Sequence, residues 1–204
     1  MAKLYFRHGA MNSAKTMNLL AVAHNYKSQN KPVLLLKPSL DVRLGADVVK
    51  CRAGLAANAD ILIDSHMNLM RVLMDSVEAQ NGERIFCVLV DEAQFLSPQN
   101  IQDLRDFTIV FDIPVICYGL RTDFTTKLFE GSKRLMELAD SIEEIKTTCV
   151  FCNRKALFNL RHCKGVALID GPSILLGGEE TYSPVCYPHY KQRIDEAVNN
   201  KPAH

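Results

Sequence analysis

The stretch of sequence that decides the fold is Gly9-Ala10-Met11-Asn12-Ser13-Ala14-Lys15-Thr16. It matches the phosphate-loop pattern G-x-x-x-x-G-K-[ST] at every position but one. A glycine at such a turn lets backbone N–H groups curl around phosphate oxygens, and the helix that follows directs its positive end at them. We expect Lys15 to bridge the β- and γ-phosphates of a nucleotide and Thr16 to offer its hydroxyl to Mg²⁺. The alternative is an ordinary strand–turn–helix with a surface lysine.

The exception to the pattern is Ala14, which stands where the pattern has its second glycine. Glycine adopts positive and negative φ alike, whereas alanine adopts only negative φ cheaply. If residue 14 is already helical, alanine costs little. If the loop needs a positive φ there, we expect phosphate binding to weaken.

Short apolar runs alternate with longer amphipathic stretches on both sides of this loop. The apolar runs predict strands at residues 3–6, 32–37, 85–90, 114–118 and 141–147. The amphipathic stretches predict helices at residues 14–29, 65–80, 98–107 and 130–139, and Ser97 before Pro98 is a typical helix start. Alternation of this kind predicts an α/β fold, a P-loop (RecA-like) parallel sheet with helices on both faces.

After residue 148 cysteine, glycine and proline become frequent and the helical periodicity ends. We therefore expect a P-loop α/β domain over residues 1–148 and a small zinc-ribbon-like domain over residues 149–190. A tail over residues 191–204 would be helical or frayed.

A pair of carboxylates follows the predicted strand at residues 85–90, where Asp91 and Glu92 end a buried apolar run. Asp91 stands where P-loop proteins carry the acid that holds Mg²⁺ directly or through water. Glu92 is placed to take a proton from an attacking hydroxyl or water. The alternative is an exposed acidic strand end, which the pairing with Lys15 and Thr16 disfavours.

Composition excludes several classes of protein. The chain has 204 residues, 48% of them hydrophobic, with 24 Lys and Arg against 23 Asp and Glu. A buried core is therefore available, and the balanced charge disfavours a general nucleic-acid or membrane-surface binder. The apolar runs are strand-sized, short of the ~20 residues that a spanning helix needs. Residues 1–6 lack the pattern of a cleaved signal segment, so we expect a cytoplasmic protein.

The seven cysteines suit a reducing compartment, and three of them belong to two metal-ligand pairs, Cys149-x-x-Cys152 and Cys186-x-x-His189. Tetrahedral zinc takes four N or S ligands, and a two-residue spacer lets both members of a pair bind one ion. Because protein ligands fill all four positions, we expect a structural Zn²⁺.

The other cysteines are expected to play no part in this site. Cys51, Cys87 and Cys117 lie in or near apolar runs and are predicted to be inert core thiols. Cys163 follows His162, and adjacent residues rarely bind one zinc ion tetrahedrally.

Taken in order along the chain, these motifs resemble those of the type II thymidine kinases, the tetrameric family of cellular and bacterial enzymes. The matching segments are residues 9–16, 90–95, 118–129, 177–178 and 182–186. The resemblance covers about residues 3–190, and the combination is specific although any single segment is weak.

The resemblance implies transfer of the γ-phosphate of Mg-ATP to the 5′-hydroxyl of thymidine, with Glu92 as the base. ATP would lie on residues 9–16, with Asp91, Gln94 and Arg43 beside its phosphates. Met11 and Tyr182 would line the thymidine pocket, together with Phe95, Leu120, Phe124 and Phe129. A lasso-like lid would close over the base, carrying Ser173, Ile174, Leu175, Leu176 and Gly177. The family also implies a homotetramer that is inhibited by dTTP.

Two other functions stay open at this point. A P-loop joined to a zinc module also describes nucleic-acid-binding ATPases, although the zinc module has few clustered Lys or Arg residues. The other alternative is an inactive homologue, and Ala14 is the only feature of the sequence that suggests it. The phenylalanines of the expected pocket are alternatively core residues.

Overall fold

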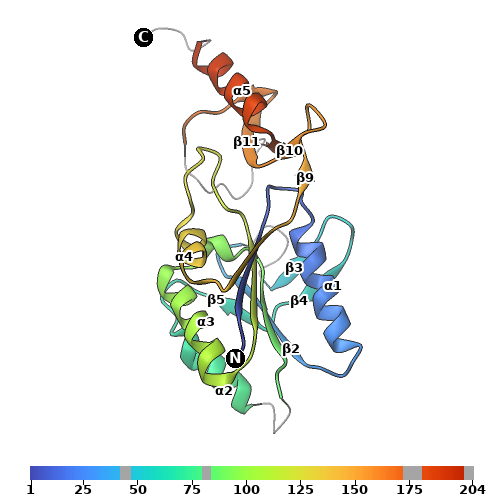
Figure 1. Ribbon diagram of the computed structural model, residues 1–204, viewed down its shortest axis with the longest axis vertical. Helices are drawn as coiled ribbons and strands as arrows, with labels where there is room; N and C mark the ends of the chain where they lie inside the picture. Colours follow the sequence, from blue (N-terminus) through green and yellow to red (C-terminus); the bar gives the residue numbers. More distant parts are fainter. Residues whose placement is uncertain (42–46, 80–83, 172–180, 200–204) are drawn as a thin grey trace.

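The centre of the molecule is a six-stranded sheet in the order β5-β2-β6-β7-β1-β8, with every neighbouring pair parallel. A computed structural model describes residues 1–41, 47–79, 84–171 and 181–199. The expectation of a parallel α/β sheet is confirmed, and Figure 1 shows the strands side by side between layers of helices. The strands are β1 (Leu4–His8), β2 (Val33–Pro38), β5 (Ile61–Ile63), β6 (Cys87–Val90), β7 (Val115–Gly119) and β8 (Ser141–Glu144).

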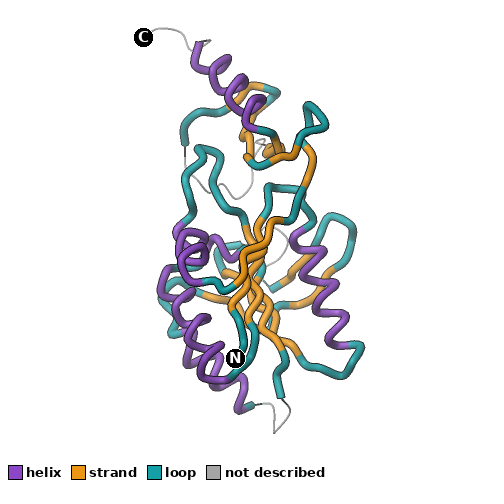
Figure 2. The backbone as a smooth tube through the Cα atoms, viewed as in Figure 1, coloured by secondary structure: helices purple, strands orange, loops and turns teal. Residues whose placement is uncertain are grey.

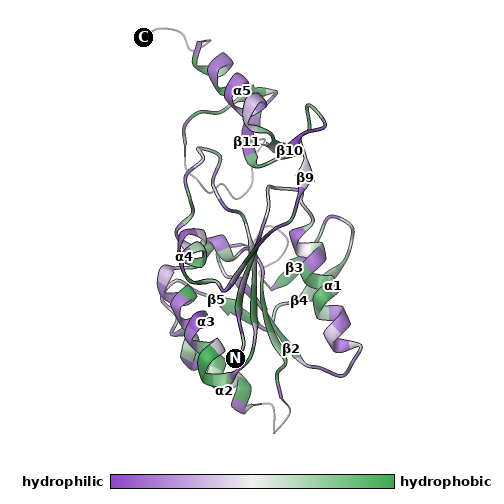
Figure 3. Ribbon diagram, viewed as in Figure 1, coloured by the Kyte–Doolittle hydropathy of each residue, from purple (hydrophilic) through white to green (hydrophobic). Residues whose placement is uncertain are grey.

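Helices cover both faces of this sheet, and its central strands β2, β6 and β7 are therefore buried throughout. Their nearly continuous apolar sequences are typical of parallel strands covered on both faces. Figure 2 shows α1 (Lys15–Lys27) on one side of the strands and the other α-helices of this domain on the opposite side. These are α2 (Leu69–Glu78), α3 (Pro98–Phe111) and α4 (Glu130–Leu138). Each helix layer has its own apolar cluster against the sheet, and Figure 3 shows hydrophobic colouring along the central strands.

The helix ends follow local capping chemistry. Ser97 caps α3 and Pro98 lies in its first turn, as expected, and Asn100 completes a capping box with Ser97. The expected start of the second helix at residue 65 is wrong, since the Asn68 side chain accepts a hydrogen bond from Arg71 N and α2 begins one residue later. The third helix runs four residues beyond the expected residue 107, to Phe111.

Within the α/β domain, three short strands were not expected from the sequence, and one expected strand is divided. The hairpin β3 (Val48–Lys50) and β4 (Ala56–Asn58) packs over α1, and β5 forms one edge of the sheet. Each has three residues, too few for a periodic pattern. The strand expected over residues 141–147 ends at Glu144, and β9 (Thr147–Thr148) leaves the sheet to pair with β10 (Lys155–Ala156).

The C-terminal module lies at one end of the molecule, beyond the carboxyl ends of the parallel strands (Figure 1). Its three-stranded sheet pairs β11 (Phe158–Cys163) with β12 (Val166–Ala167) and β13 (Thr181–Val185), both antiparallel. Helix α5 (Tyr187–Asn199) packs Tyr190, Ile194 and Ala197 against the module's own buried cluster. The boundary expected at residue 191 therefore falls inside α5. Within the described residues, no helix is long and apolar enough to cross a bilayer.

Candidate active site and metal cluster

The phosphate-loop residues join the carboxyl end of β1 to α1, as the motif requires. Lys15 Nζ donates to the carbonyl of Ala10 at 2.9 Å, so its ammonium group lies over the loop. At Gly9 a Cβ atom would overlap Ser13 Oγ and lie 2.5 Å from the carbonyl of Ile145. Only glycine therefore fits at the start of this loop.

The backbone conformation of Ala14 shows whether the phosphate loop needs a positive φ at this position. Ala14 caps α1 with φ 64° and ψ 27°, the left-handed region that glycine occupies without penalty. For an L-residue with a Cβ atom this conformation costs about 1–2 kcal/mol. The loop therefore has the shape that the glycine pattern specifies, and the alanine holds it under strain.

We expect the substitution Ala14→Gly to raise the free energy of unfolding by about 0.5–1 kcal/mol, because relief of the left-handed strain outweighs the greater chain entropy of glycine. Ala21→Gly, at an exposed position inside α1, is the matched control and should lower the same quantity by about 1 kcal/mol. Chemical denaturation of both variants measures the two effects. Equal destabilisation in the two variants would contradict the strain at Ala14.

The acidic pair ends β6 beside the phosphate loop. Thr16 Oγ1 donates to the Asp91 carboxylate, at 3.1 Å from Oδ2 and 3.3 Å from Oδ1. Burial raises the pKa of Asp91 to about 7, the neighbouring Glu92 charge adds to the rise, and the Thr16 hydroxyl opposes it. A hydroxyl and a buried carboxylate in contact are the oxygen ligands that Mg²⁺ prefers, and a bound cation would favour the ionised form of Asp91.

Glu92 is the residue between this carboxylate and the 3₁₀ turn η1 (Ala93–Phe95), and its φ is 49°. A left-handed glutamate is uncommon, and strained backbone of this kind concentrates at functional sites. Gln94 explains how the side chain is held: its Nε2 donates to Glu92 Oε2, and its Oε1 accepts from Leu120 N at 3.0 Å. At Gly119 a Cβ atom would lie 2.7 Å from Gln94 Oε1, so the glycine leaves room for this amide.

These residues surround one cavity of about 710 Å³, within the range of roughly 300–1,000 Å³ that is typical of small-molecule sites. It brings together most of the residues expected at the ATP and thymidine sites: Met11, Asn12, Ser13, Ala14, Lys15, Thr16, Asp91, Glu92, Gln94, Phe95, Leu120, Phe124, Phe129 and Tyr182. Gly9 and Ala10 do not line it; they line a neighbouring small pocket. Arg43 and the expected lid residues Ser173, Ile174, Leu175, Leu176 and Gly177 lie outside the described residues.

The cavity is also lined by residues that were not expected there from the sequence. Lys37, at the end of β2, is 2% exposed; its Nζ donates to Val48 O at 3.0 Å and lies 3.6 Å from Asp41 Oδ2. A lysine in an otherwise apolar strand could have indicated this position from the sequence, because lysines are rarely buried unless they are paired. Residues 48–53, Thr122, Asp123 and Asn159 line the cavity as well, through contacts that no local pattern indicates.

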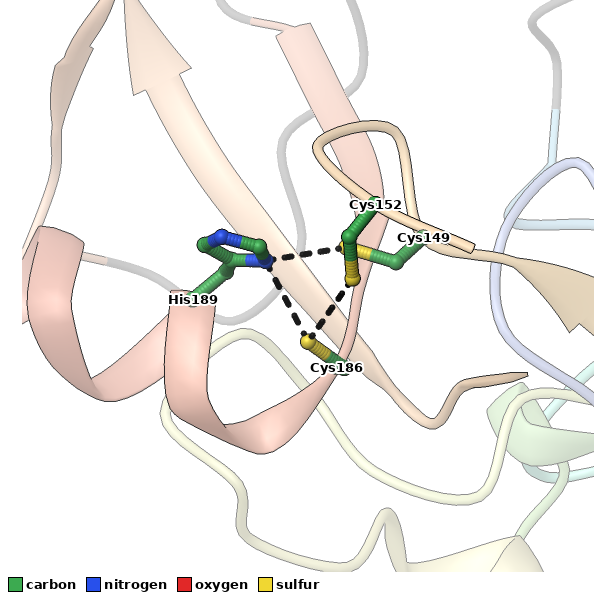
Figure 4. Close-up of side chains that lie close together, drawn as sticks. All are labelled: Cys149, Cys152, Cys186 and His189. Atoms are coloured by element: carbon green, nitrogen blue, oxygen red, sulfur yellow. Dashed lines mark hydrogen bonds between the residues drawn. The ribbon is translucent and has the colours of Figure 1, made fainter. Parts of the chain in front are cut away.

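The four predicted metal ligands meet in the C-terminal module (Figure 4). Their ligand atoms lie within 4.8 Å of one another, with 3.8 Å between the sulfurs of Cys152 and Cys186 and 3.3 Å from Cys186 Sγ to His189 Nδ1. Zinc–sulfur bonds of about 2.3 Å in a tetrahedron separate the ligands by ~3.8 Å, so the cluster fits Zn²⁺. Burial opposes ionisation of Cys149, but hydrogen bonds from the backbone of Cys186 and Phe151 and from His189 lower its pKa to about 6, which favours the thiolate that a metal needs.

The remaining cysteines lie outside this cluster. Cys51, Cys87 and Cys117 are buried in the α/β domain, as expected of core thiols. Burial raises the pKa of Cys87 to about 12 and also raises the pKa of Cys117, which suppresses thiolate reactivity.

Comparison with known proteins identifies close relatives. A family model described as thymidine kinase matches residues 2–190. The thymidine kinase of Streptococcus pyogenes serotype M28 (strain MGAS6180) is 46% identical over 190 residues, which cover 93% of this chain and 97% of that protein. The thymidine kinase of Lactococcus lactis subsp. lactis (strain IL1403) has the same identity and coverage. A solved chain of the Pif1 helicase from Candida albicans aligns over 71% of this chain and 36% of its own, with a TM-score of 0.40 and 10% identity, too weak a likeness to support an argument.

Proposed function

This chain belongs to the thymidine kinase family, and we propose that it transfers the γ-phosphate of Mg-ATP to the 5′-hydroxyl of thymidine, giving dTMP and ADP. The main observation that supports the proposal is that a single cavity of about 710 Å³ is lined by residues 11–16 of the phosphate loop, by the acidic pair and by three phenylalanines. These phenylalanines, which we call the aromatic wall, are Phe95, Phe124 and Phe129. Phosphoryl transfer needs positioning, charge neutralisation and a base within one site.

The phosphate end of the cavity is lined by residues 11–16 of the phosphate loop. Backbone N–H groups of the loop and the N-terminus of α1 would bind the phosphate oxygens, and Lys15 would exchange its contact with Ala10 O for the β- and γ-phosphates. Thr16 and Asp91 would hold Mg²⁺. When bound, Mg²⁺ would neutralise charge on the transferred phosphoryl group.

Glu92 is proposed as the base that takes the proton from the 5′-hydroxyl. It lines the cavity together with Asp91 and Phe95, and its carbonyl accepts a hydrogen bond from Phe95 N at 3.1 Å. Phe95 and Phe129 meet edge to face, with ring centroids 5.7 Å apart, and offer a thymine ring an apolar surface for stacking. In this arrangement the nucleoside hydroxyl would point from the aromatic wall toward Glu92 and the γ-phosphate.

Gln94 is proposed as a positioning residue for Glu92, because its amide bridges the carboxylate and the Leu120 N–H. We expect Gln94→Leu to lower kcat for thymidine by about tenfold, since leucine cannot donate to Glu92 or accept from the backbone. Gln99→Leu, at an exposed position of α3, is the control and should keep wild-type kcat. Steady-state assays measure both, and an unchanged kcat in Gln94→Leu would remove this role.

The C-terminal cluster is proposed to hold a structural Zn²⁺, since its four ligands leave no position for a reacting water. A homotetramer, inhibition by dTTP and a cytoplasmic location are further proposals that come from the family resemblance. Light scattering of the purified protein and inhibition assays with dTTP test the first two.

The experiment that tests the function is thymidine-dependent formation of ADP from Mg-ATP, with deoxycytidine, deoxyadenosine and no nucleoside as controls. Turnover with thymidine alone is the expected result. ATP hydrolysis that depends on single-stranded DNA and not on thymidine would favour the nucleic-acid-binding ATPase. No turnover with any addition would favour an inactive homologue, and recovery of activity in Ala14→Gly would then assign the defect to the loop.

A further inference from the structure

The loop between β7 and α4 connects the proposed thymidine pocket to the C-terminal module. Figure 1 shows it extending from the sheet toward α5 and β11. It is a narrow turn, closed by a bridge between Thr122 and Leu128 and by a hydrogen bond from Asp123 N to Lys127 O at 2.9 Å. Phe124, part of the cavity wall, lies inside this turn and is 2% exposed.

Two side chains of the C-terminal module hold Phe124. Tyr190 Oη donates to the Phe124 carbonyl at 2.7 Å. Arg161 is 3% exposed, and its guanidinium lies over the Phe124 ring, 4.6 Å from the ring centroid. The backbone and the ring of Phe124 are therefore both fixed from outside their own domain.

The metal cluster in turn fixes Tyr190. Tyr190 follows the ligand His189 in the first turn of α5, and its N–H donates to the carbonyl of the ligand Cys186 at 2.9 Å. Its ring packs on Phe158 of β11, with centroids 5.5 Å apart. A continuous series of contacts thus leads from the metal ligands through Tyr190 to the wall of the cavity.

We propose that Tyr190 is a positioning residue for the nucleoside. The metal cluster sets the position of the first turn of α5, and the Tyr190 hydroxyl on that turn fixes the Phe124 carbonyl and thereby the shape of the thymidine pocket. The inference rests on the proposed function, because Phe124 is taken as part of that pocket. The phosphate loop and Glu92 are held by contacts that do not involve Tyr190. Lys15 contacts Ala10 O, Thr16 contacts Asp91, and Gln94 contacts Glu92. The phosphate loop also contacts the C-terminal module directly, because Asn159 Oδ1 accepts from Met11 N at 2.7 Å. Loss of the Tyr190 hydroxyl should therefore weaken thymidine binding without slowing the chemical step.

The test compares Tyr190→Phe with Tyr187→Phe in the full-length, zinc-loaded protein. Tyr187 lies on the same helix and its ring also packs on Phe158, at 5.4 Å, but its hydroxyl makes no hydrogen bond within the described part of the chain. A neutral hydrogen bond contributes about 1 kcal/mol, equivalent to roughly a fivefold change in an equilibrium constant. We expect the thymidine KM to rise about fivefold in Tyr190→Phe, with kcat, the ATP KM and zinc content unchanged, and no shift in Tyr187→Phe.

Hydrogen exchange of residues 120–129 gives a second readout that does not depend on activity, and it should be faster in Tyr190→Phe than in Tyr187→Phe. Unchanged thymidine KM and unchanged exchange in Tyr190→Phe would overturn the inference. So would equal shifts in both variants, or a fall in kcat at constant KM. If the wild-type protein did not use thymidine, the proposed function would fail by itself, while the exchange experiment would still decide whether Tyr190 holds the loop.

Discussion

Replacing Glu92 by glutamine is expected to lower thymidine turnover by about 10²-fold or more, while thymidine and ATP still bind. Glutamine has the size of glutamate and its side-chain oxygen can still accept the hydrogen bond from Gln94 Nε2, so the local geometry is kept. What the variant loses is the carboxylate that we propose takes the proton. Its effect should therefore appear in kcat.

The effect is not expected to come from the metal site. The Glu92 charge raises the pKa of the neighbouring Asp91, so removing that charge favours the ionised Asp91 that would bind Mg²⁺. Single-turnover assays together with equilibrium binding of thymidine and of an ATP analogue separate chemistry from binding. Glu137→Gln, at an exposed position of α4, is the control. Near-normal turnover in Glu92→Gln would exclude Glu92 as the base.

Replacing Cys149 by serine is expected to release most of the bound zinc and to abolish most thymidine turnover. Cys149 is one of the four proposed ligands, and its sulfur lies 3.5 Å from His189 Nδ1. Serine is a poor zinc ligand because its hydroxyl is not ionised at neutral pH. Structural zinc contributes on the order of 10 kcal/mol to the folding of small domains. The buried cluster of the C-terminal module is small, so it cannot replace that contribution.

The matched control is Cys163→Ser, in the same module but outside the cluster. Metal analysis should show wild-type zinc in the control and little in Cys149→Ser. Limited proteolysis should cut residues 149–199 faster in Cys149→Ser, and the α/β domain should remain resistant because its own two apolar clusters are intact. Full zinc content in Cys149→Ser would refute the assigned ligand set.

Much of this site could be predicted from the sequence because its reactive and ligand-binding residues lie in short, contiguous motifs. The phosphate loop and the acidic pair each follow a buried strand, and parallel strands bring their carboxyl ends to one edge of the sheet. Two-residue spacers likewise place Cys149 with Cys152, and Cys186 with His189, so each pair is already suited to one metal ion. Local spacing, strand order and ligand chemistry were sufficient for these residues.

Other features depend on residues far apart in the chain, and no local pattern carries them. The sequence left open whether Ala14 is strained, and the folded loop decides it with φ 64°. The hydrogen bond from Leu120 N to Gln94 exists only once the α/β domain has folded. The hydrogen bond from Tyr190 to Phe124, 66 residues away, exists only once the two modules pack together.

The sequence by itself therefore determined the chemistry of this protein, a phosphate loop with an acidic partner and a four-ligand metal cluster, because contiguous residues set the local backbone and the ligand types. Only the tertiary structure decided how these groups are held, because the burial and direction of a side chain are set by elements from elsewhere in the chain.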